Sequence, residues 1–183
     1  MKPAQIFTAI ASLALVAGVL FSQISVKDEH HHTTADIALP LDLVTNGECE
    51  ACAMYVLEQP GPRGQLVYRD GSRRYFCSIG DLLAILTLPS PLGEPRQIWI
   101  EAMPADMVLA DNSTEPQRWV NVNQAHFVVG IERRGVMGMP AVSLASSEDA
   151  KIFIGRNGGE LSDWDGIQLI HKEYLLRKQL PPG

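Results

Sequence analysis

Residues 65–88, QLVYRDGSRRYFCSIGDLLAILTL, contain two short strand patterns followed by a helix pattern. The dipeptide Asp70-Gly71 separates the two strand patterns and is typical of a tight hairpin turn. Ser78 and Asp81 have the S-x-x-D spacing of a capping box, and the leucine-rich run that follows has helical periodicity. This stretch therefore predicts a β-hairpin followed directly by a helix.

The same order of elements recurs along the chain. The first half also contains a strand-like run over 53–59, a loop over 60–64 and a strand over 96–103. The second half contains strands over 118–125 and 126–134, a loop over 134–140 and a short extended run over 140–144. Two helices follow, one over about 146–156 opened by Ser146 and Asp149, and one over about 162–177 opened by Ser162 and Asp165. Strands followed by a helix, twice, predict an α+β fold of two small ββαβ-like units packed together, with halves at about 47–112 and 113–180.

The first 26 residues form a separate N-terminal segment, predicted to be a hydrophobic helix. Residues 6–25 carry no charge, and a bilayer core needs about 20 apolar residues. No A-x-A cleavage site follows the run, so an uncleaved membrane anchor is favoured over a cleaved signal peptide or a buried core helix. Lys2 favours an orientation with the N-terminus inside, which places the body outside the cytoplasm.

Residues 27–46 are interpreted as a linker between this segment and the body. The linker contains the run His30, His31 and His32 beside Asp28 and Glu29. A short histidine tract can bind copper or zinc, although a solvated polar linker explains the same composition.

Charge and motifs exclude several classes of function. The 183 residues include 15 basic and 21 acidic side chains, a net charge of −6. An acidic chain without a basic stripe does not suit nucleic acid as a partner. The sequence has no Ser-His-Asp signature, no catalytic pair of carboxylates and no phosphate-binding glycine loop, so we expect no enzymatic activity.

The residues with the most specific chemistry are Cys52 and Met54. If the chain is extended here, both side chains point to the same face, and a thiolate beside a thioether selects Cu(I) over hard cations. Zinc is disfavoured, because structural zinc sites use four ligands and methionine is not one of them. The alternative is that Met54 only fills the core.

Further candidate ligands lie elsewhere in the chain. Met137 and Met139 recur in a glycine-bearing loop, where long thioether side chains have little packing reason to repeat. Cys49 stands three residues before Cys52, and His126 precedes a predicted strand, where a packed core histidine is the alternative.

Several motifs of the body together resemble one known family. The motifs are Cys52-Ala-Met54-Tyr-Val56, Pro60-Gly-Pro-Arg-Gly-Gln65, Trp119-Val-Asn-Val122 and Gly135-Val-Met-Gly-Met-Pro-Ala-Val142. In these stretches the chain resembles the NosL family, copper-binding accessory proteins of nitrous oxide reductase maturation. The resemblance extends from about residue 47 to 159, which is most of the body.

The resemblance implies a membrane-tethered periplasmic Cu(I) chaperone that passes copper to a maturation complex containing an ABC-type transporter. It implies Cys52 and Met54 as ligands, with Met137 at the position of the family's loop methionine and Met139 as a substitute for it. Family members are typically anchored as lipoproteins through an N-terminal cysteine, and this chain has no cysteine before Cys49. The hydrophobic segment would then provide the tether, or the protein would be released into the periplasm.

Two other functions stay open at this point because of the cysteines. Cys49 and Cys52 have the C-x-x-C spacing of thiol oxidoreductases, although their acidic neighbours disfavour a thiolate. Alternatively, the chain is a non-catalytic interaction module in which Cys49 pairs with Cys52 or Cys77 for stability. Cys77 stands immediately before a predicted helix start, where the pKa of a thiol is lowered.

Overall fold

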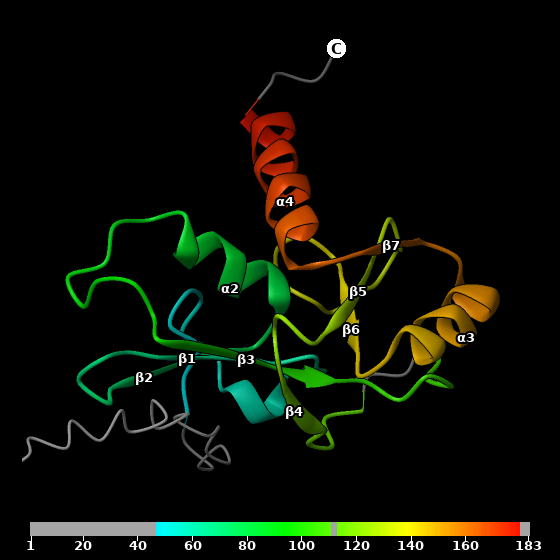
Figure 1. Ribbon diagram of the computed structural model, residues 1–183, viewed down its shortest axis with the longest axis horizontal. Helices are drawn as coiled ribbons and strands as arrows, with labels where there is room; N and C mark the ends of the chain where they lie inside the picture. The colour runs from blue at the N-terminus through cyan, green and yellow to red at the C-terminus, as the bar shows by residue number, and fades with distance from the viewer. Residues whose placement is uncertain (1–46, 111–112, 180–183) are drawn as a thin grey trace, which may run out of the picture. The chain divides into compact units, whose positions relative to one another are not determined.

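Two antiparallel sheets, each with a helix packed on it, make up the computed structural model, which describes residues 47–110 and 113–179 (Figure 1). In chain order the elements are η1 (Val56–Glu58), β1 (Gly64–Val67), β2 (Arg73–Phe76), α2 (Ile79–Leu86), β3 (Gln97–Ala102), β4 (Arg118–Asn121), β5 (His126–Val129), β6 (Val142–Leu144), α3 (Ser147–Asn157), β7 (Glu160–Ser162) and α4 (Trp164–Gln179). The predicted α+β class is confirmed.

The two sheets are built from the same structural repeat. The segments β1–β2–α2–β3 and β5–β6–α3–β7 both have the order ββαβ, and their strands lie in the orders β2-β1-β3 and β6-β5-β7. The prediction of two ββαβ-like units is therefore confirmed. Strand β4 belongs to the second predicted half of the sequence, but it pairs with β3 and extends the first sheet to four strands.

The hairpin and both serine caps form as predicted. Strand β1 pairs with β2 from Gly64 opposite Phe76 to Val67 opposite Arg73, and the turn between the strands uses a positive φ of 82° at Gly71. The capping serine of each repeat begins its helix in the same way. The Ser78 side chain accepts the backbone N–H of Asp81, and Ser146 accepts that of Asp149.

Two local predictions were wrong. Residues 53–59 are not an extended strand: Ala53 is in the left-handed region, with φ 59°, and the chain then forms the short helix η1. Ser162 does not cap the last helix, because it lies in the short strand β7. The side chain of Asp163 takes that role and accepts the N–H of Gly166 at 2.8 Å.

The two repeats are joined through strands β3 and β6. The backbone N–H of Met103 donates to the carbonyl of Ser143 at 2.7 Å, and the Ser143 hydroxyl donates to the carbonyl of Glu101. Helix α4 contacts α2, β5 and β7, so it packs on both repeats. In Figure 1 the C-terminal part of α4 extends away from the rest of the body.

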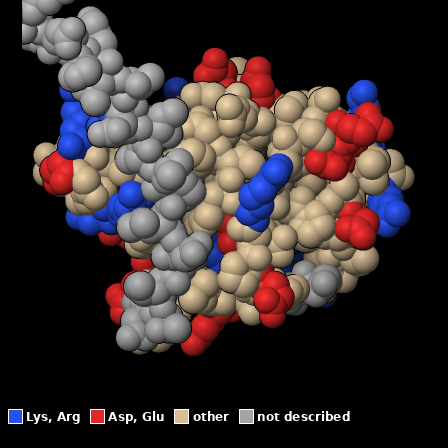
Figure 2. Space-filling model, turned by 60° about the horizontal axis from the view of Figure 1, so that its bottom comes forward, with Lys and Arg blue, Asp and Glu red and all other residues tan. Residues whose placement is uncertain are grey.

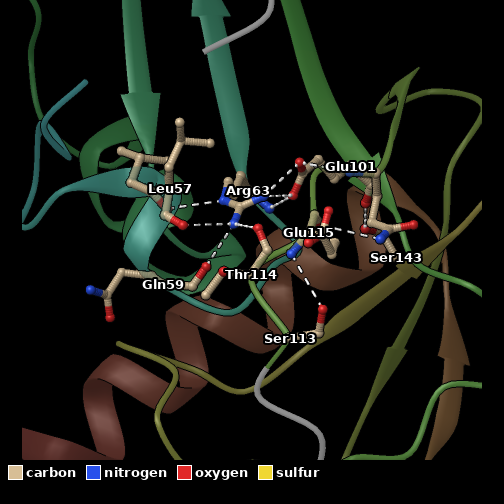
Figure 3. Close-up of polar contacts among 10 residues, drawn as sticks. Leu57, Gln59, Arg63, Glu101, Ser113, Thr114, Glu115 and Ser143 are labelled. Atoms are coloured by element: carbon tan, nitrogen blue, oxygen red, sulfur yellow. Dashed lines mark hydrogen bonds and ion pairs between the residues drawn. The ribbon is translucent and has the colours of Figure 1, made fainter. Parts of the chain in front are cut away.

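A fully buried ion pair ties the loop before β1 to strand β3. Arg63 and Glu101 are 0% and 1% exposed, and Arg63 Nη1 lies 3.0 Å from Glu101 Oε1 (Figure 3). Arg63 also donates to the carbonyls of Val56, Gln59 and Thr114, at 2.9, 2.9 and 2.6 Å. Every side of the guanidinium is thus hydrogen-bonded, which a buried charge requires.

The predicted N-terminal segment, 1–26, and the histidine-bearing linker, 27–46, lie outside the described residues. Within 47–110 and 113–179, no helix has the length and hydrophobicity needed to cross a bilayer. On the face shown in Figure 2, Lys and Arg side chains of the described residues are dispersed among acidic and uncharged ones. Where the described residues of this face are visible, they form no continuous basic patch of the kind that nucleic-acid binding uses.

Candidate metal centre

A tight turn at the start of the described chain places two cysteines next to strand β2. The backbone N–H of Cys49 donates to the carbonyl of Met54, and that of Ala53 donates to the carbonyl of Cys49, both at 2.8 Å. The turn lies beside Tyr75 of β2, whose carbonyl accepts the N–H of Glu50 at 2.9 Å. Cys77 follows the end of β2, so this contact brings the turn to the third cysteine.

Three thiols and one carboxylate meet at this point. The Sγ atoms of Cys49 and Cys77 each lie 3.3 Å from Asp81 Oδ2. The Sγ atoms of Cys52 and Cys77 are 3.6 Å apart, and all four donor atoms lie within 4.8 Å of one another. We call Cys49, Cys52, Cys77 and Asp81 the thiol cluster. All three cysteines are free.

The thiol cluster is closed on one side and open on the other. Cys49 and Cys77 are each 2% exposed and Asp81 is 8% exposed, whereas Cys52 is only half-buried. An ion or a partner ligand arriving from solvent therefore meets Cys52 first.

The three thiols differ in acidity because they share hydrogen bonds. Hydrogen bonding from Cys77 lowers the pKa of Cys49 to about 6, against the opposing effect of burial. Burial raises the pKa of Cys52 to about 11. The hydrogen bond with Cys49, together with burial, raises the pKa of Cys77 far above its ordinary range. Cys49 is therefore the thiol of the cluster that ionises most readily, and a metal ion that binds a further thiol as thiolate displaces its proton.

The first turn of α2 supports negative charge in the cluster. Cys77 stands immediately before the capping residue Ser78, and its backbone N–H points to Cys49 Sγ at 3.5 Å. Asp81 lies in the first turn of the helix. The Cys77 N–H at this helix start stabilises a thiolate at Cys49. The predicted lowering of the pKa of Cys77 itself is wrong, because its hydrogen bond with Cys49 and its burial raise that pKa.

The predicted methionine ligands lie in different environments. Met54 is half-buried and packs against the same core cluster as Cys49 and Cys77. Met137 is exposed, and its carbonyl accepts the Ser78 hydroxyl at 2.8 Å, next in sequence to Cys77. Met139 is buried in the core. His126 lies in β5 opposite Leu144, and among the described residues it is not part of the thiol cluster.

A close contact between two glycines holds the methionine loop against α2. A Cβ atom added to Gly80 would lie 2.8 Å from the carbonyl oxygen of Met137 and would also collide with the backbone nitrogen of Met139. A Cβ atom on Gly138, which has a φ of 72°, would lie 3.0 Å from the backbone of Gly80. The absence of both side chains therefore allows the loop to reach the first turn of the helix.

We expect Gly80→Ala to destabilise the protein by about 1–3 kcal/mol, because the new methyl group displaces backbone atoms of the loop. The matched control is Gly155→Ala in α3, where no atom lies within 4 Å of the added Cβ. That change should stabilise the protein by up to about 1 kcal/mol through helix propensity alone. Urea unfolding followed by circular dichroism measures both changes. Equal effects of the two substitutions would show that the loop is not held at Gly80.

Cys77 and Asp81 are not among the metal ligands predicted from the sequence. In the sequence, Asp81 is recognisable as part of a capping box, and Cys77 as a thiol before a helix or a possible disulfide partner of Cys49. The contact of Cys49 with Tyr75 unites these residues with Cys52, and no local pattern in the sequence reports that contact. The one local signal is the cysteine immediately before the capping serine.

Comparison with known proteins identifies the family. The family model described as NosL matches residues 40–170, which is most of the chain. The chain belongs to the NosL family. The resemblance found in the sequence motifs is therefore confirmed.

Relatives of this NosL chain occur in Stutzerimonas stutzeri and Achromobacter cycloclastes. It is 27% identical over 128 residues to a copper-binding lipoprotein NosL of Stutzerimonas stutzeri, a match that covers 70% of the chain and 65% of the relative. It is 29% identical over 150 residues to the copper-binding lipoprotein NosL of Achromobacter cycloclastes, covering 80% and 75%. The chain thus spans about two thirds to three quarters of the length of these relatives.

A solved structure shares the fold of this NosL chain. The crystal structure of the copper chaperone NosL from Shewanella denitrificans superposes with a TM-score of 0.59 at 29% identity, covering 70% of this chain and 94% of that one. The relatives are described as copper-binding proteins and a copper chaperone, which supports the prediction that the chain is not an enzyme.

Proposed function

We propose that the chain binds one Cu(I) ion at the open side of the thiol cluster and passes it to another protein. The observation that carries this proposal is the meeting of three thiols at one point, with Cys52 partly exposed and the others buried. Thiolate and thioether ligands together favour Cu(I) over hard cations. The descriptions of the relatives as copper-binding proteins agree with it.

Cys49, Cys52 and Met54 are the proposed copper ligands. Cys49 has the lowest pKa of the three thiols, and the pKa of Cys52 is raised less than that of Cys77. Cys49 and Cys52 therefore lose their protons to an arriving ion more readily than Cys77, and Cys52 is the thiol that solvent reaches. Met54 closes the turn that holds both cysteines and adds a neutral thioether. In this arrangement the Cys77 thiol stays protonated and keeps its hydrogen bond to the Asp81 carboxylate, an oxygen ligand that Cu(I) does not favour.

Met137 is the proposed exchange ligand. It is exposed on the loop held against α2, close in space to the residue that follows Cys77. A thioether at the surface exchanges readily and suits an ion that is passed on. Met139 is buried in the core, so packing is its main role, and His126 has no assigned part in the copper site.

The cellular role proposed here is delivery of copper for nitrous oxide reductase maturation, through a complex containing an ABC-type transporter. The protein would act on the periplasmic side of the membrane. Residues 1–26 would tether the protein, because the uncharged run 6–25 is long and apolar enough to cross a bilayer. Residues 27–46 would act as a linker that lets the body move away from the membrane surface. The net charge of −6 favours the approach of cations.

The pKa values and the exposure of Cys49 and Cys52 argue against the thiol oxidoreductase alternative. An exchanging thiol must be both ionised and accessible to a disulfide. Here Cys49, the acidic thiol, is buried, whereas the accessible thiol, Cys52, has a pKa raised to about 11. The structural-module alternative needs a disulfide, and the three cysteines are free.

Cu(I) titration of the reduced full chain, in competition with a chromophoric Cu(I) chelator under anaerobic conditions, tests the proposal. We expect one tightly held Cu(I) per chain and an X-ray absorption spectrum with a shell of two or three sulfur atoms. A shell dominated by nitrogen or oxygen, or a failure to compete with the chelator, would contradict copper binding at this site. For the cellular role, deleting the gene should lower the copper content of nitrous oxide reductase in the host. An unchanged content would contradict delivery.

A further inference from the structure

The outer face of helix α4 carries a pattern of leucines and charges that matches itself when the helix is reversed. Residues 169–176 read Leu-Ile-His-Lys-Glu-Tyr-Leu-Leu, with a leucine at each end and a lysine beside a glutamate at the centre. An α-helix turns by about 100° per residue, which places Leu169, Lys172, Glu173 and Leu176 within about 100° of its circumference. We call these four residues the α4 stripe.

The α4 stripe points away from the core. Ile167 and His171, on the opposite side of the helix, are its buried residues. Leu169 and Leu176 are 59% and 62% exposed, and the two charged residues of the stripe are exposed as well. The C-terminal part of α4 extends away from the rest of the body in Figure 1, so a partner can approach it from outside.

The charges of the α4 stripe do not neutralise each other within the helix. Lys172 and Glu173 are neighbours in sequence, and side chains one residue apart on a helix do not face each other. Among the residues that the structure describes, neither takes part in an ion pair. The two opposite charges, flanked by exposed leucines, are therefore available to a partner.

We propose that the α4 stripe is a dimer interface, on which α4 of a second copy of this chain packs in the antiparallel direction. In a two-fold symmetric interface, residue i of each copy contacts residue j of the other. A two-fold axis between positions 172 and 173 places Leu169 opposite Leu176 of the partner subunit and Lys172 opposite the partner's Glu173. The same axis repeats both contacts with the copies exchanged, so one register satisfies the whole stripe.

A groove beside the α4 stripe adds apolar surface to this interface. It lies between α2 and α4, has a volume of about 520 Å³, and is lined by Leu83 and Leu86 of α2 and by Leu175 of α4. Lys172 and Leu176 of the stripe line it as well. A helix packed on the stripe therefore also covers part of the groove.

The composition of the α4 stripe favours a second copy over a membrane surface. A helix that lies on a membrane has a broad apolar face and a polar face rich in Lys and Arg. The stripe has only two leucines, and the acidic Glu173 stands between them. Three of its four residues follow residue 170, where the match to the NosL family model ends. The proposed interface therefore depends on residues outside the family match and not on the thiol cluster.

The test captures the dimer with a covalent cross-link, because one pair of helices buries less than the roughly 1,600 Å² of a typical stable interface. The full-length variants Lys172→Glu and Glu173→Lys are mixed in phosphatidylcholine vesicles and treated with a carbodiimide, which joins a lysine to a glutamate in contact. One variant has two acidic residues at positions 172 and 173 and the other has two basic ones, so these positions can be joined only between different chains. We expect mass spectrometry of the mixture to find position 172 of one chain linked to position 173 of the other.

Two leucine variants show whether the cross-link reports a specific interface. Leu169→Gln, introduced into both chains, should lower the yield of the 172–173 cross-link about 10-fold or more, since a two-fold interface loses the leucine contact twice. The matched control Leu88→Gln, at a leucine that is 60% exposed outside α4, should leave the yield unchanged. A mixture without the 172–173 cross-link would overturn the dimer, and so would equal yields from the two leucine variants. Cu(I) binding plays no part in this measurement, so its result leaves the copper proposal as it stands.

Discussion

Replacing Arg63 with methionine is expected to lower the free energy of unfolding by about 3–5 kcal/mol, the usual cost of breaking a buried ion pair from one side. Methionine fills a similar volume but leaves the Glu101 carboxylate charged and 1% exposed. The carbonyls of Gln59 and Thr114 lose the Arg63 donor at the same time (Figure 3), and the Val56 carbonyl keeps only the N–H of Gln59. Urea unfolding monitored by circular dichroism measures the loss.

Two further substitutions identify the cause of the loss. In the double variant Arg63→Met/Glu101→Leu the buried charge is gone, so the total loss should be smaller than the sum of the two single losses. Arg63→Lys keeps the charge but cannot reach several acceptors with one planar group, so an intermediate loss is expected.

The matched control is Arg74→Met, which removes an exposed ion pair. Arg74 lies 3.3 Å from Glu50, with side chains 36% and 47% exposed. Such pairs contribute between 0 and about 1 kcal/mol. A loss of this size in Arg63→Met would contradict the stabilising role of the buried pair.

Arg63→Met should also disturb the turn that carries Cys49 and Cys52. Arg63 holds η1 through the carbonyl of Val56, and the N–H of Val56 donates to Gly47 just before the cysteine turn. Helix η1 thus connects the ion pair to the turn that carries Cys49 and Cys52. The hydrogen bonds of Val56 therefore contribute both to the stability of the fold and to the position of the cysteine turn.

Local signals explain why the order of elements was predictable. The Asp70-Gly71 turn and the capping serines act within a few residues, so their patterns in the sequence report the structure directly. The prediction of a strand over 53–59 was wrong because the conformation of this run depends on contacts with Arg63, which follows it in the sequence, and on the left-handed backbone of Ala53. Strand β7, with three residues, is too short to show periodicity.

The meeting of the three thiols and Asp81 was only partly predictable, for a related reason. Cys49, Cys52 and Met54 belong to one turn, and adjacency in sequence brought them together. Cys77 is 25 residues from Cys52, and Asp81 is 32 residues from Cys49. Their meeting depends on how the turn lies against β2, a tertiary contact between elements that are not consecutive.

Replacing Cys52 with serine is expected to lower the Cu(I) affinity by about 100-fold or more, since it removes a direct ligand, and outer-shell changes alone cost about 10–100-fold. Cys52 combines partial exposure with contact to the buried thiols, so it is both the entry point and a ligand. Serine has the same shape, and its hydroxyl is a poor ligand for Cu(I). Competition with a chromophoric chelator measures the change, and thermal unfolding checks that the fold is kept.

The order of effects among the cysteines is more informative than any single value. Cys49→Ser should be as damaging to Cu(I) binding as Cys52→Ser, because the two supply the thiolates of the proposed copper site. Cys77→Ser should lower Cu(I) affinity by a smaller factor, since a serine hydroxyl can still donate to Asp81 in place of the thiol. If Cys77→Ser were instead the most damaging change for Cu(I), copper would lie deep in the cluster, and the assignment of Met54 as its third ligand would be wrong.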